Sequence, residues 1–71
     1  MVRYAVVLED GGSNCGASVP DLPGCVATGA TAAEAAARIR GAIAMQLEGM
    51  TEDGEPIPTP TTAVEYVEVK V

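Results

Sequence analysis

The sequence predicts an α+β fold with the element order β-β-β-α-β: an antiparallel meander plus a C-terminal strand, with one helix packed on one face. Three observations carry this prediction. Apolar and polar residues alternate at both ends of the chain, turn residues divide the early part into short segments, and a capping motif opens one long helical pattern. Because 71 residues suffice for one domain at most, we expect residues 1–71 to form a single domain.

The first predicted strand covers residues 2–9, where the β-rich run VRYAVVLE places Val2, Tyr4, Val6 and Leu8 on one face. The turn cluster DGGSN follows, and a second strand is predicted over residues 15–19. This strand carries only the small residues Gly16 and Ser18 on one side, which suits close approach by another part of a protein.

Residues 20–24, PDLPG, form the best-defined turn in the chain. Proline at Pro20 and Pro23 fixes φ near the value that turns require, and Gly24 allows a positive φ without steric cost. Residues 25–28 can then form only a brief third strand, which ends at Gly29.

The helix is predicted to begin after Thr31, because Thr31 and Glu34 have the spacing of a capping box. It runs to about residue 50, and a spacing of 100° per residue defines one apolar stripe: Ala32, Ala36, Ile39, Ile43, Leu47 and Met50. Gly41 interrupts the helix beside this stripe and favours a tight contact within the chain over a contact between subunits. We assign structural roles to Pro20, Thr31, Glu34, Ile39, Ile43 and Leu47.

Residues 51–62 form a proline-rich extended connection, and the alternating sequence AVEYVEVKV predicts a last strand over residues 63–71. A single helix covers only one face of such a sheet, so the other face or a sheet edge should meet another copy of the chain or a different protein. Because the chain is short and has only two aromatic residues, we expect a homodimer or a higher homo-oligomer.

Composition excludes several functions. The net charge is −6, and Arg3, Arg38, Arg40 and Lys70 are the only cations, so direct binding to nucleic acid is not expected. The acidic surface could instead meet a basic protein partner, although acidity also serves solubility alone. The apolar run near the N-terminus is too short for a signal peptide or a membrane span, which predicts a cytoplasmic protein without membrane contact.

The residues offer little for catalysis or for holding a cofactor. There is no histidine, so catalytic triads and histidine metal sites cannot be built. If residues 20–24 close a hairpin, Cys15 and Cys25 lie on the order of 17 Å apart, which predicts two reduced thiols. The glycine-rich run GGSNCG lacks the lysine of a phosphate-binding loop. We therefore expect no enzyme activity, no cofactor and no metal.

The element order and four short motifs resemble the HicB family of bacterial antitoxins. The motifs are Tyr4 with its apolar strand, VPDLPGC at residues 19–25, Gly29 with Thr31 and Glu34, and GEPIP at residues 54–58. The resemblance implies a partial ribonuclease-H-like fold without nuclease activity. It also implies an antitoxin of a type II toxin-antitoxin pair that binds and blocks a small basic HicA-type toxin, an mRNA-cleaving ribonuclease.

Many HicB proteins carry a C-terminal DNA-binding domain, and residues 1–71 contain no such domain. The predicted partner contacts are Asp21, Leu22, Pro23 and Gly24, although turn geometry alone also explains the prolines and the glycine. The first alternative function is a stand-alone homo-oligomeric regulatory or scaffold domain with no toxin partner. A metal-dependent nuclease is a third reading, suggested by the implied fold and the ten carboxylates.

Overall fold

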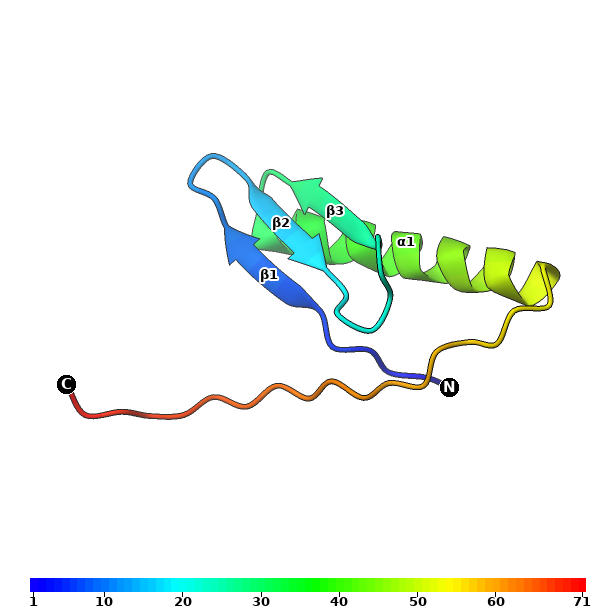
Figure 1. Cartoon of the computed structure of the whole chain (residues 1–71). Coiled ribbons are helices and arrows are strands. Elements are labelled where there is room, and N and C mark those ends of the chain that lie inside the picture. The colour runs from blue at the N-terminus through cyan, green and yellow to red at the C-terminus, as the bar shows by residue number, and fades with distance from the viewer.

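A computed structural model describes residues 1–71 and contains three strands followed by one helix. The strands are β1 (Val7–Asp10), β2 (Cys15–Ser18) and β3 (Val26–Gly29), and the helix is α1 (Ala32–Glu52), as Figure 1 shows. The predicted α+β fold, with an antiparallel meander and one helix, is therefore confirmed.

The sheet has the order β1-β2-β3, and both strand pairs are antiparallel. β1 begins at Val7 rather than at Val2, because Val7 pairs with Ser18, the last residue of β2. The chain then turns at Pro20, so the residues before Val7 have no partner strand within the sheet. The sheet thus leaves an open edge along β1.

The core lies between the sheet and α1, which contacts all three strands. Its buried residues come from one face of β2, from the turn after it and from the first half of the helix: Cys15, Ala17, Val19, Leu22, Cys25, Ala35 and Ile39. Within the predicted helical stripe, Ile39 is buried and Ile43 and Leu47 are partly buried. Ala32 is exposed and Ala35 takes its place in the core.

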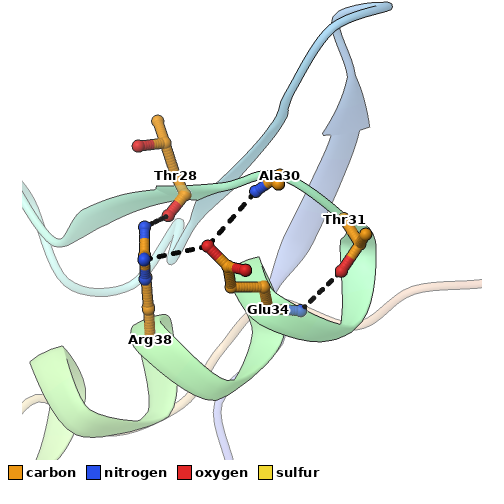
Figure 2. Close-up of polar contacts among 5 residues, drawn as sticks. All are labelled: Thr28, Ala30, Thr31, Glu34 and Arg38. Carbon is orange, nitrogen blue, oxygen red and sulfur yellow. Dashed lines mark hydrogen bonds and ion pairs between the residues drawn. The ribbon is translucent and has the colours of Figure 1, made fainter.

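Polar contacts join the end of β3 to the start of α1 (Figure 2). The Thr31 hydroxyl accepts a hydrogen bond from the Glu34 backbone N–H at 3.1 Å. The Glu34 carboxylate accepts from the backbone N–H of Ala30 at 3.3 Å, one residue before the position that a standard capping box uses. Arg38 lies 2.8 Å from Glu34 and donates to the Thr28 carbonyl at 3.0 Å. The helix start is thereby tied to the sheet.

The strand predicted over residues 63–71 is not formed. Residues 55–71 are extended, but no backbone hydrogen bond joins residues 63–71 to the sheet, and Val67 and Val69 remain 74% and 73% exposed. Figure 1 shows this segment leaving the body of the molecule and running past β1. The alternating pattern specified an extended chain, but a strand also requires a neighbouring edge to pair with.

Gly41 does not make the tight contact within the chain that its position suggested. It is exposed, and a Cβ atom built there would meet no atom within 4 Å. This flank of α1, the helix surface around Gly41, is therefore not covered by any other part of the same chain.

Candidate interaction surfaces

The turn after β2 is held by its own backbone. The Leu22 N–H donates to the Val19 carbonyl at 3.1 Å, and the Cys25 N–H donates to the Leu22 carbonyl at 3.1 Å. Gly24 adopts a φ of 80°, a conformation that side-chain-bearing residues rarely take. This geometry turns the Leu22 side chain inward, where it is 0% exposed.

Asp21 joins this turn to the C-terminal part of the chain. One carboxylate oxygen accepts from the backbone N–H groups of Thr61 and Thr62, both at 3.1 Å. The other oxygen accepts from their hydroxyls, at 3.0 Å and 2.9 Å. These bonds, foremost the one from the Thr62 N–H, hold the pKa of the Asp21 carboxyl below its ordinary value of 3.8.

A second attachment lies nearby, where the Tyr4 hydroxyl donates to the Pro58 carbonyl at 2.6 Å. Asp21 and Tyr4 together fix residues 58–62 against the folded part of the chain. Neither attachment is predictable from the sequence, because no local pattern links residues about forty or more positions apart.

The four predicted partner contacts occupy different environments. Leu22 is fully buried and offers no surface to a partner, whereas Asp21 is engaged by the chain's own threonines. Pro23 and Gly24 are exposed beside them. The turn therefore presents only two of these four residues freely to the outside.

An apolar groove of about 620 Å³ lies between the N-terminal segment and α1, beside the open edge of β1. One wall contains Val2, Tyr4, Val6 and Leu8, and the other contains the helix residues Ile39, Ile43 and Leu47. Arg40 is the only charged residue that lines it. No residue of the C-terminal segment lines the groove, so it is open in the single chain.

Carboxylates gather at the C-terminal end of α1, where Glu48, Glu52, Asp53 and Glu55 are all exposed. The last turn of the helix contains no basic residue, and the chain's one ion pair, between Arg38 and Glu34, lies at the other end. Negative charges at this end of a helix are repelled by the helix dipole, at a typical cost of about 0.3–1 kcal/mol each. Helix stability does not account for this arrangement.

The face of the sheet opposite α1 is not covered by another element. It carries a shallow hollow of about 270 Å³ over all three strands, with Glu9 as its only charged residue. The small residues Gly16 and Ser18 form the floor of this hollow, as their positions in the sequence suggested. Backbone from another molecule could approach closely here.

The two thiols lie in the core of the fold. Cys15 and Cys25 are both free and buried, and burial raises the pKa of the Cys25 thiol, which disfavours the reactive thiolate. No group of three or more acidic or cysteine side chains comes together as a metal site would require. No helix in the chain combines the length and the apolar character needed to cross a membrane.

Comparisons with known proteins give two findings. A family model described as the HicB-like antitoxin of bacterial toxin-antitoxin system matches residues 4–70. A 14.9 kDa uncharacterised protein from the rep-hol intergenic region of Haemophilus phage HP1 (strain HP1c1) is 36% identical over 64 residues. The match covers 90% of this chain and 48% of the phage protein, so the chain spans about half the length of that relative. No solved structure matches the chain significantly.

Proposed function

This chain belongs to the family of HicB-like antitoxins of bacterial toxin-antitoxin systems, and we propose that it binds and blocks a small basic HicA-type toxin that cleaves mRNA. Residues 1–71 act as a single non-catalytic domain in this proposal, in the cytoplasm where mRNA is cleaved. The antitoxin covers the cationic surface with which the toxin binds RNA, and thereby excludes the substrate.

The observation that carries this proposal is the acidic end of α1. Glu48, Glu52, Asp53 and Glu55 are exposed, have no cationic partner in the chain and oppose the helix dipole. A basic protein docked at this end would remove the repulsion and supply the missing counter-charges. The exposed residues Pro23 and Gly24 are a second proposed contact. Leu22 would hold the turn against the core, and Asp21 would hold Thr61 and Thr62 beside it.

The test is binding to the product of a small basic reading frame next to this gene, measured at low and at moderate salt. Replacing Glu48, Glu52, Asp53 and Glu55 by their amides should slow association by roughly tenfold or more at low salt. The control replaces Glu9 and Asp10 by their amides, which removes two acidic charges from the β1–β2 hairpin, and the matched variant replaces only Glu52 and Asp53.

We expect the control to bind almost as the natural chain does. If no complex with the neighbouring gene product forms, the toxin proposal is refuted. If the control loses more affinity than the helix variant, the contact lies on the hairpin instead. The chain alone should not degrade RNA in the presence of Mg²⁺ or Mn²⁺. Turnover that an Asp10 or Asp21 substitution abolishes would identify a nuclease instead.

A second candidate function is a stand-alone homo-oligomeric regulatory or scaffold domain. The apolar groove beside β1 favours it, because a contiguous apolar lining that stays uncovered in one chain is typical of an interaction surface. The two functions are compatible, since the groove and the acidic end of α1 are formed by different residues. Association without any binding to the neighbouring gene product would leave only this second function.

A further inference from the structure

The C-terminal segment has the pattern of a half-buried strand but has no partner. Val67, Val69 and Val71 alternate with Glu68 and Lys70, an arrangement typical of a strand with one apolar face. All three valines are exposed in the single chain, and Tyr66 is 96% exposed. Exposed apolar residues in strict alternation indicate a surface that is covered when the protein is assembled.

A matching acceptor exists elsewhere on the same chain. β1 pairs only with β2, so its other edge has free backbone donors and acceptors. The apolar groove lies directly beside that edge, because Leu8 of β1 and Val6 just before it contribute to its wall. A strand added to this edge would place every second side chain into the groove.

We propose that residues 63–71 of one copy form a strand along the open edge of β1 in a second copy, and that the two copies exchange these strands reciprocally. Val67, Val69 and Val71 enter the apolar groove of the partner, while Glu68 and Lys70 face away from it. Such an exchange is a closed two-fold arrangement, because each copy supplies one strand and one groove. This exchange rests on the self-association of the second candidate function and specifies which surfaces form it.

The attachment of the segment to its own chain favours a second copy as the acceptor. Thr61 and Thr62 are fixed to Asp21, and residues 62–64 pass beside Arg3, Tyr4 and Ala5 without reaching the groove. Beyond them, residues 63–71 span about 30 Å at ~3.3 Å per residue, and Figure 1 shows them pointing away from the body. This length of chain extends to where another molecule would lie.

The charges around the groove also suit this occupant better than a basic toxin. Arg40 lines the groove, and Arg3 lies in the sequence between the groove residues Val2 and Tyr4. Neither arginine forms an ion pair within the chain. The arriving strand carries Glu65 on the same face as the three valines and Glu68 on the other face. These carboxylates can approach the two arginines, whereas a cationic partner would be repelled by them.

The first experiment measures molar mass in solution by light scattering. The natural chain should have twice the 7.2 kDa mass of one chain, and Val69→Lys should have the mass of one. The matched control is Val26→Lys, because Val26 is about as exposed as Val69 but lies on β3, away from the groove. This control should remain a dimer, and both variants should keep the helical circular dichroism of the natural chain.

A mixed sample of isotope-labelled and unlabelled chains then identifies the acceptor. Nuclear Overhauser effects between the methyl groups of Val69 and those of Ile43 or Leu47 should be observed between chains. If those effects arise only within one chain, the segment closes its own groove and the exchange is refuted.

Other outcomes separate this inference from the proposed self-association. If the natural chain is a monomer, both the strand exchange and the proposed self-association are refuted. A dimer that survives Val69→Lys, or that Val26→Lys disrupts, keeps self-association but refutes the exchange. Toxin binding through the acidic end of α1 is measured separately, so its presence or absence decides neither outcome.

Discussion

Residues 7–52 and residues 55–71 both contain segments in which apolar and polar residues alternate, yet only the first region closes on itself. In the first region each strand pairs with the next, and the helix covers one face of the sheet. In the second region the chain is extended and mostly exposed. It is attached by hydrogen bonds to Asp21 of the first region and by one from Tyr4, which precedes β1. The strands and the helix of the first region pair and pack with one another. The second region is held by hydrogen bonds and contributes no residue to the buried core.

The difference shows what alternation of apolar residues can and cannot specify. In residues 7–29 the turns are short, so each strand meets the next one without a long loop to close. Residues 63–71 follow a long connection, and the edge they could pair with is not fixed by any nearby turn. Alternation therefore determines that the chain is extended, and the connecting turns determine which strand it pairs with.

The largest expected effect comes from shortening the most buried side chain of the packed region. Leu22→Ala should lower the free energy of unfolding by about 2–5 kcal/mol, because Leu22 is fully buried and its loss leaves a cavity. Ile57→Ala, in the attached region, should change it by less than about 0.5 kcal/mol, since Ile57 is 42% exposed. Urea unfolding followed by circular dichroism measures both.

Equal losses for Leu22→Ala and Ile57→Ala would show that the two regions unfold as one packed unit, against the distinction made above. A loss for Leu22→Ala below about 1 kcal/mol would mean that the turn is not part of the core.

A smaller effect is expected where β3 approaches the helix. A Cβ atom on Gly29 would lie 2.6 Å from the Ala35 backbone nitrogen and 3.0 Å from the Glu34 carbonyl carbon. Because backbone atoms cannot easily yield, Gly29→Ala should cost about 1–3 kcal/mol. Gly41→Ala meets no atom within 4 Å and should stabilise the helix by about 0.5–1 kcal/mol.

Thermal unfolding should therefore shift in opposite directions for these two glycine-to-alanine variants, at about 4–8 °C per kcal/mol for a domain of this size. If Gly41→Ala instead lowers the melting temperature, the open flank of α1 is occupied in solution by another chain.

Much of the packed region was predictable from the sequence, because its determinants are local. Pro20, Gly24 and Thr31 act within a few residues of their own positions, and the turn and the helix start lie where these residues predict them. Alternation along one strand places Cys15, Ala17 and Val19 on one face, and the structure shows that this face is the buried one. Ala35 was missed, because the packing of the first helical turn depends on how closely Gly29 approaches it.

The interaction surfaces were less predictable, because they combine residues distant in sequence. The groove joins the first residues of the chain to the middle of α1, and the Asp21 attachment spans about forty positions. The acidic end of α1 was visible as a set of carboxylates. Its significance depended on finding that no cation lies in the last helical turn.

The smallest expected effect concerns the Asp21 attachment and its dependence on pH. Because the folded state lowers the pKa of Asp21 below 3.8, the attachment is fully present above that value and is lost as the pH falls through the lower folded value. The amide chemical shifts of Thr61 and Thr62 should therefore move together below pH 3.8. Asp21→Asn should loosen residues 61–71 at neutral pH with almost no change in melting temperature, whereas Asp53→Asn should leave both amides unaffected. If the amide chemical shifts of Thr61 and Thr62 change neither with pH nor on Asp21 substitution, the C-terminal region is held by contacts other than these hydrogen bonds.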